Sequence, residues 1–193
     1  MQKLTRTDLM SLEHYAAART AMRTDVMAHK VARRIALSPN ATLYFEDATT
    51  IRYQIQEMLR VERIFEADEI QSELDAYNPL IPDGGNWKAT FMFEYADVAE
   101  RRQALAQMAG IEHHIWVQVG DHVRIKAVAN EDVERSTDDK TSAVHFLRFE
   151  LDAASIAAAK SGASVRMGIE HAGMPCAVTL DARSTAALVA DLD

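Results

Sequence analysis

The chain has little cysteine, glycine or proline, and each shortage excludes a class of protein. Its one cysteine, Cys176, cannot form an intrachain disulfide or a zinc or iron–sulfur site built from several cysteines. Seven glycines and four prolines in 193 residues exclude collagen-like and low-complexity chains. No apolar run reaches the roughly 18 residues of a transmembrane helix, and no signal-peptide pattern follows Met1. We therefore expect a cytoplasmic protein without a membrane anchor.

The composition is otherwise typical of a globular protein, but charge is unevenly distributed along the chain. The formal net charge is −8, although the first 40 residues hold seven Lys/Arg against three Asp/Glu, a net of +4. The acidic field of the whole chain would repel phosphates, which argues against nucleic-acid binding. We expect the basic N-terminal region to pack against acidic residues of this chain or of a second copy. We also predict that the chain forms a homo-oligomer, most simply a homodimer.

Residue periodicity predicts an α+β fold, with N-terminal helices and a small hairpin followed by a mostly antiparallel sheet with packed helices. A helical region begins at the caps Thr7 and Asp8 and continues to His29, with a possible break at residues 19–24. Two short strands, 35–37 and 42–45, flank the Pro39-Asn40 turn, and a helix covers 50–75. The later strands are 90–95, 115–119, 123–128, 143–151, 165–169 and 176–180, the later helices are 97–109, 152–160 and 182–192, and 130–140 is an exposed polar loop.

The segment from Asn78 to Asn86 is the best candidate for a domain boundary, because prolines and glycines interrupt it. This predicts a helical half with a β-hairpin at 1–86 and a mixed half at 87–193, or else a single compact domain. Apolar residues lie between the two prolines of this loop, and Trp87 follows it. Such loops often line pockets or interfaces. The candidates for a subunit contact or pocket lid are Tyr77, Asn78, Pro79 and Trp87.

Three polar residues are predicted to lie in apolar surroundings. At 100° per residue, Glu62 falls in the middle of the apolar stripe of the helix at 50–75, and Glu57 falls at its edge. On the strand 143–151, His145 shares a face with the apolar residues and is predicted to point inward. His29 continues an apolar stripe of the first helical region and is expected to be half-buried. The simpler interpretation of each is a paired or hydrogen-bonded residue of the core.

The sharper hypothesis is that His29, Glu62 and His145, assisted by Glu57, hold a non-haem metal ion such as iron. The sequence spacing does not show that these residues meet. Motifs that would name a reaction are missing: there is no HExxH, GxSxG, P-loop or GxGxxG pattern. Cys176 enters an apolar strand and is predicted to be an inert thiol.

Several stretches resemble a bacterial family classed only as a domain of unknown function. They are His29-Lys30 with Arg33-Arg34, residues 52–60, residues 74–82 and residues 140–149. Relatives in that family are often encoded near rubrerythrin-like and iron–sulfur oxidoreductase proteins, so the resemblance implies a redox protein as partner. It implies no catalytic residue. We therefore expect an accessory or binding protein of a redox or oxidative-stress system, with a metal-dependent enzyme or metal-binding protein as the alternative and a purely structural subunit contact as a third reading.

Overall fold

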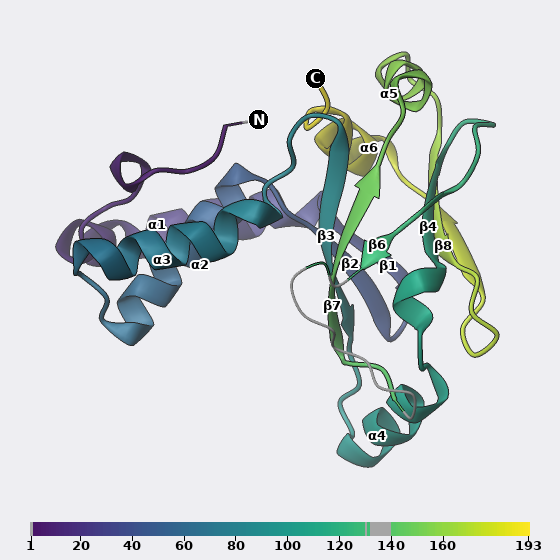
Figure 1. Cartoon of the computed structure of the whole chain (residues 1–193), viewed down its shortest axis with the longest axis horizontal. Coiled ribbons are helices and arrows are strands. Elements are labelled where there is room, and N and C mark those ends of the chain that lie inside the picture. The colour runs from purple at the N-terminus through teal and green to yellow at the C-terminus, as the bar shows by residue number, and fades with distance from the viewer. Residues whose placement is uncertain (1, 130, 132–139) are drawn as a thin grey trace.

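The molecule has two regions, which Figure 1 shows side by side: α1–α3 on one side, and the strands with the remaining helices on the other. The structure is a computed structural model, and it describes residues 2–129, 131 and 140–193. The helices are α1 (Leu12–Val31), α2 (Ala48–Glu62), α3 (Ala67–Tyr77), α4 (Val98–Gln107), α5 (Ala153–Lys160) and α6 (Ala182–Val189), with short 3₁₀ turns η1 (Arg6–Asp8), η2 (Asn78–Leu80) and η3 (Ile111–His114). The first three helices form an arm, and the strands form the body beside it (Figure 1).

The body consists of two antiparallel sheets. The strands are β1 (Arg34–Ser38), β2 (Ala41–Phe45), β3 (Asn86–Phe93), β4 (Ile115–Val119), β5 (Ile125–Lys126), β6 (Val128–Ala129), β7 (Val144–Glu150), β8 (Val165–Ile169) and β9 (Cys176–Thr179). One sheet has the order β1-β2-β3-β7-β6, and the other has the order β5-β4-β8-β9. Every neighbouring pair is antiparallel, as expected for short connections. The α+β prediction is confirmed.

The two sheets pack face to face around one continuous hydrophobic core. In β3 the residues alternate, so Trp87, Ala89, Phe91 and Phe93 are buried while the residues between them face the outer side of the sheet. The same alternation in β7 buries His145 completely, so the predicted inward direction of this side chain is confirmed. The outer face of the five-stranded sheet turns toward the arm (Figure 1).

The arm has a much smaller core. Asp47 caps α2 by accepting from the Thr50 backbone N–H, and the turns that follow place Ile51, Ile55 and Leu59 on one face. That face packs against Leu74 of α3, which is fully buried. Burying this stripe is what fixes α2 and α3 beside each other.

Three predictions about the arm are wrong. The helix expected at 50–75 is two helices, because Arg63 adopts a left-handed conformation (φ 57°) and ends α2. Glu62 is consequently not in the middle of a buried stripe: it is the last residue of α2 and is exposed. In addition, the region at 12–31 is one unbroken helix.

In the body, the strand expected at 123–128 is divided between β5 and β6, which belong to different sheets. Of the predicted loop 130–140, residues 130 and 132–139 lie outside the described residues. The domain division at residue 86 stays a prediction. The structure shows that β2 of the first half pairs with β3, which begins at Asn86. Among the described residues, no helix has both the length and the apolar character to cross a membrane.

Candidate functional site

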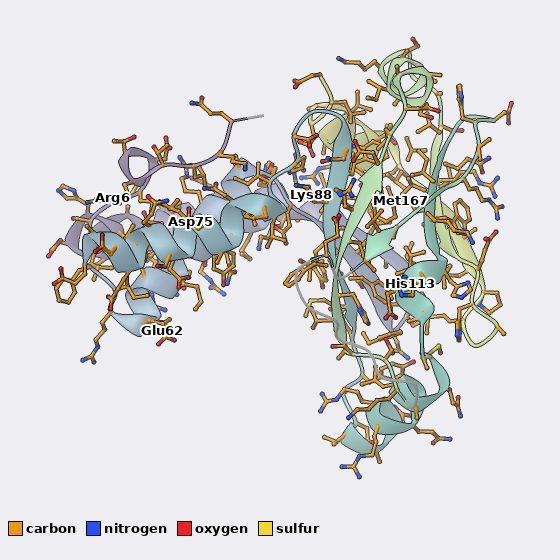
Figure 2. The ribbon with its side chains drawn as sticks, in the orientation of Figure 1. Arg6, Glu62, Asp75, Lys88, His113 and Met167 are labelled. Atoms are coloured by element: carbon orange, nitrogen blue, oxygen red, sulfur yellow. The ribbon has the colours of Figure 1, made fainter. Side chains whose placement is uncertain are left out.

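A cleft of about 860 Å³ lies between the arm and the outer face of the five-stranded sheet. Its floor comes from β3 and β7, and its wall comes from α2, α3 and the segment that follows α3. Lys88 marks the junction of arm and body, while Glu62 lies at the far end of the arm (Figure 2). The cleft is therefore built from both regions of the molecule.

The register of the sheet brings two basic residues together on the floor. Lys88 of β3 is paired with Arg148 of β7, and the next outward pair along the strands is Thr90 with Phe146. All four residues line the cleft. Because side chains opposite each other on neighbouring strands are about 5 Å apart at Cβ, the two cationic groups share one end of the floor.

The wall follows the chain from Tyr77 to Asp83. Asn78 anchors this segment, because its side chain donates to the Leu4 carbonyl and accepts from the Leu4 N–H. Across the cleft, the Lys88 ammonium donates to the carbonyl oxygens of Pro79 (2.6 Å) and Ile81 (3.1 Å). These contacts tie the wall to the floor and leave the side chains of Tyr77 and Leu80 lining the space between them.

Burial and charge act in opposite directions on the groups at this end of the cleft. Burial lowers the pKa of the Lys88 ammonium, while the nearby Asp83 carboxylate opposes that shift. Arg148 donates from Nε and Nη2 to the two oxygens of Glu131, at 2.8 Å each, and also pairs with Glu150. The Arg148 hydrogen bonds hold the pKa of Glu131 below its ordinary value. The Arg148 guanidinium thus already binds a carboxylate through two parallel hydrogen bonds.

A second carboxylate of the cleft, Glu46, is bound by hydroxyl groups instead of a cation. Thr50 donates to one oxygen at 2.6 Å, and Thr90 donates to the other at 3.0 Å. Glu46 follows β2, and its backbone N–H donates to the Lys88 carbonyl. It therefore joins the N-terminal turn of α2 to the sheet and forms part of the cleft's frame.

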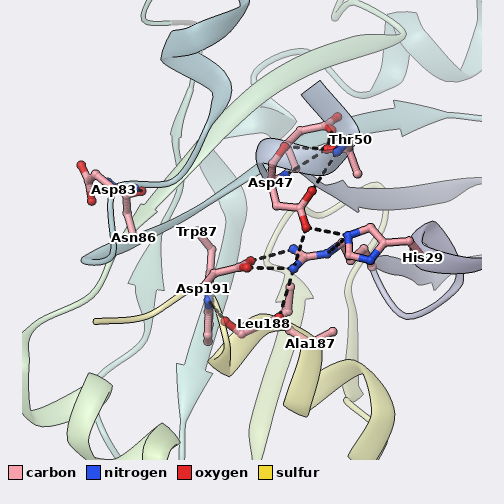
Figure 3. Close-up of polar contacts among 11 residues, drawn as sticks. His29, Asp47, Thr50, Asp83, Asn86, Trp87, Ala187, Leu188 and Asp191 are labelled. Carbon is pink, nitrogen blue, oxygen red and sulfur yellow. Dashed lines mark hydrogen bonds and ion pairs between the residues drawn. The ribbon is translucent and has the colours of Figure 1, made fainter. Parts of the chain in front are cut away.

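His29 lies in a polar cluster at the base of the arm (Figure 3). Its Nε2 is 2.6 Å from the Asp47 carboxylate and 3.0 Å from Arg33 Nε. The buried Arg33 guanidinium also donates two hydrogen bonds to the Asp191 carboxylate, at 2.7 and 2.8 Å, and one to the Ala187 carbonyl. Burial raises the pKa of Asp191, even though Arg33 opposes the shift. The cluster joins α1 and the cap of α2 to the C-terminal helix of the body.

The other predicted metal ligands have different partners. His145 is fully buried, with Nε2 2.7 Å from Thr141 Oγ1 and 3.8 Å from Glu112 Oε2. Glu57 accepts from Tyr15 (2.6 Å) and from Arg19 (2.7 and 2.8 Å), and the solvent-exposed Glu62 is at the end of α2.

The structure therefore does not bring these four residues together. In residues 2–129, 131 and 140–193, no group of three or more His, Cys, Asp or Glu side chains is arranged to hold a metal ion. The reason is topological: the arm and the core between the sheets are separate environments, and the four residues are distributed between them.

The four candidates for an interface or pocket are also divided. Tyr77 and Pro79 line the cleft. Asn78 is buried against the N-terminal segment, and Trp87 is fully buried in the core of the body, where its indole Nε1 donates to the Leu188 carbonyl at 2.8 Å. Whether this segment contacts another subunit stays a prediction.

Three residues of the cleft floor were not predicted from the sequence: Lys88, Thr90 and Arg148. A usable signal was present, because each is a polar residue at an outward position of a strand whose other face is apolar. Pairing of β3 with β7 was the missing information. Without the register, two basic residues that are 60 positions apart give no sign that they are neighbours.

Comparison with known proteins places this chain among relatives without a described activity. Residues 3–192 match a family described as "Protein of unknown function (DUF3501)". A crystal structure of a novel protein of unknown function from Burkholderia pseudomallei K96243 superposes with a TM-score of 0.95, at 49% sequence identity over 100% of both chains. No curated protein matches the chain.

Proposed function

This chain belongs to the family of unknown function matched over residues 3–192, and from that premise we propose that it is an accessory protein that binds a small organic molecule in the cleft between arm and body. The cleft carries the proposal. Its volume lies within the roughly 300–1,000 Å³ of ligand sites, and its apolar walls surround a few convergent polar groups. A redox protein as partner, which the resemblance implies, belongs to the same proposal, and the homodimer stays a prediction.

The contacts across the cleft support a site that exists before its ligand arrives. Lys88 fixes the wall to the floor through two carbonyl oxygens, and Glu46 fixes the start of α2 to the sheet through two threonines. A site with its polar groups already in place binds without the cost of ordering them. This arrangement favours binding over a purely structural contact, which would need a flat apolar surface instead of a concave one.

The experiment is a ligand screen with a variant in which the cleft is filled. Ala76 of α3 lines the cleft and is exposed, so Ala76→Trp places an indole in the cavity without disturbing either core. Gln71→Trp is the matched control, because Gln71 is an exposed residue of the same helix outside the cleft. Binding of small organic compounds to the three proteins is measured by ligand-observed NMR.

We expect compounds that bind the wild type and Gln71→Trp with one-to-one stoichiometry and lose binding to Ala76→Trp by about tenfold or more, since the indole removes contact area from the ligand. Compounds that bind all three proteins equally would place the site elsewhere and contradict the proposal. A broad screen without any binder would also contradict it.

A further inference from the structure

We propose that the ligand of this cleft is an organic monocarboxylate, an apolar body carrying one carboxylate group, which Arg148 and Lys88 hold at the cleft floor. This inference rests on the proposed function and names the chemical class that the site would recognise. Four kinds of observation support it: the pairing of the two cations, the carboxylate that Arg148 already holds, the partly desolvated ammonium of Lys88 and the apolar walls.

The two cations form one recognition unit. Lys88 and Arg148 are directly opposite each other on β3 and β7, and both project from the outer face of the sheet into the cleft. Burial lowers the pKa of the Lys88 ammonium most and Arg148 lowers it further, while Asp83 and Glu131 oppose the shift. A ligand anion placed between the two cations would relieve the repulsion that remains. Two adjacent donors on rigid strands are a better scaffold for an anion than two on a loop.

Arg148 already holds a carboxylate in the geometry that a ligand would use. Its Nε and Nη2 donate in parallel to the two oxygens of Glu131, at 2.8 Å each. A planar guanidinium can donate two parallel hydrogen bonds to the two oxygens of a carboxylate or a phosphate. An amide has only one oxygen and cannot accept in this way. The Glu131 side chain is about half exposed (52%), so solvent screens the pair and a ligand carboxylate can compete for Arg148.

Lys88 supplies a donor deeper in the cleft. Its ammonium has three N–H bonds, of which two are used by the carbonyls of Pro79 and Ile81. Within the part of the chain that the structure describes, the third has no hydrogen-bond partner. A half-buried ammonium that keeps a free N–H is stabilised by an incoming anion more than a solvated one is, because burial has removed part of its water.

The rest of the lining selects for an apolar body. Met58, Tyr77 and Leu80 line the cleft on the side of the arm, and Phe146 lines it on the side of the sheet. The carboxylates of the lining point to the competing class of ligand, an organic amine. Three of them are already engaged, since Glu131 accepts from Arg148, Glu46 accepts from two threonines and Asp83 accepts from the Gly85 N–H. The fourth, Glu73, is on α3.

The test uses three probes that share one apolar chain and differ in their polar group: decanoate, decanamide and decylamine. Their affinities for the full-length wild type are measured by isothermal titration calorimetry. Arg148→Met keeps an unbranched apolar side chain and removes the guanidinium. Arg166→Met is its matched control, because Arg166 is an exposed arginine in the middle of a strand of the other sheet. Circular dichroism checks that each variant is folded.

We expect decanoate to bind the wild type and Arg166→Met about tenfold or more tighter than decanamide, as charge-assisted hydrogen bonds would give. Arg148→Met should lose that preference. Glu131→Gln removes the carboxylate that occupies Nε and Nη2 of Arg148, leaves the Glu150 pair in place, and should raise the decanoate affinity about two- to fivefold. This variant keeps the proposal testable if Arg148→Met does not fold.

Each other outcome overturns the carboxylate assignment. Equal binding of decanoate and decanamide would show that the cleft binds the apolar chain and does not select for a negative charge. Strongest binding of decylamine would show that the acidic residues of the lining determine which ligand binds. Both results would leave the proposed function standing. If none of the probes binds, the assignment is wrong, and the Ala76→Trp screen decides separately whether the cleft binds any ligand.

Discussion

The body and the arm of this molecule are stabilised in different ways. The body has one continuous core that both sheets share and that contains large aromatic residues such as Trp87, Phe91 and Phe149. Among the described residues, the arm has a smaller hydrophobic cluster around Leu74, and it adds charged contacts, among them those of Arg19 with Glu57 and of Arg33 with Asp47. Packing therefore fixes the cleft floor, whereas polar contacts position the cleft wall.

The largest loss of stability is expected from removing the guanidinium that joins the two regions. Arg33→Met leaves the buried carboxylates of Asp47 and Asp191 without their shared cation. Leaving buried charges uncompensated costs about 3–5 kcal/mol, so we expect the free energy of unfolding to fall by that amount. Urea unfolding measures the loss, and hydrogen exchange should show it first as reduced protection in α1 and α2.

The neighbouring residue provides the control for this experiment. Arg34 pairs with Glu94 at the surface, and its side chain is 54% exposed. Arg34→Met should therefore cost no more than about 1 kcal/mol. If the two variants lose the same stability, the cluster at the base of the arm contributes nothing special, and the division into two differently stabilised regions is wrong.

A second variant tests the packing of the body alone. Gly168 lies in β8, where an added Cβ would be 2.3 Å from the Cys176 carbonyl and 2.6 Å from the Trp116 ring. Neither neighbour can retreat, because one belongs to the adjacent strand and the other is buried. Gly168→Ala should thus destabilise the protein by about 2–3 kcal/mol in thermal unfolding, with loss of protection in the body.

Gly85→Ala is the control for that substitution, since its Cβ would make only ordinary contacts, at 3.6 Å or more. Its effect should stay within about 0.5 kcal/mol. A Gly168→Ala protein as stable as Gly85→Ala would mean that the core between the sheets yields easily. The cleft floor would then be no more fixed than the wall.

The same division explains how much of the structure the sequence could predict. Alternation in strand 143–151 was enough to direct His145 inward, because one face of that strand is clearly more apolar than the other. Periodicity also predicted helical structure in the arm, although it joined α2 and α3 into one helix. It failed at Glu62, because a helical projection assumes that the helix continues, and the left-handed Arg63 ends it. The position of a chain reversal depends on tertiary packing that a single periodic pattern does not contain.

The candidate site was less predictable than the fold for a related reason. Tyr77 and Pro79 could be selected from an apolar loop between breakers, which is a local pattern. Lys88 and Arg148 come together only through the pairing of β3 with β7, which is set by packing over the whole sheet. The metal hypothesis had the same weakness. It combined residues of the right type, His29 and His145 among them, from elements that the fold keeps in separate environments.

The smallest loss of stability is expected from replacing Glu57, whose carboxylate links α2 to Tyr15 and Arg19 of α1. The Arg19 guanidinium, assisted by Tyr15 and Arg60, lowers the pKa of Glu57 from 4.5 to about 2 against the effect of burial. Because the folded-state pKa is depressed, the stability that this carboxylate contributes is fully present above about pH 4.5 and is lost as the pH falls toward 2. Glu57→Gln should therefore cost about 1.5 kcal/mol at pH 7 and progressively less in that acidic window.

Urea unfolding of wild type, Glu57→Gln and the control Glu69→Gln, which changes an exposed residue of the same arm, measures the gap at each pH. A gap that does not change with pH would show that Glu57 acts through its shape instead of its charge, and the arm would then resemble the body in being held by packing.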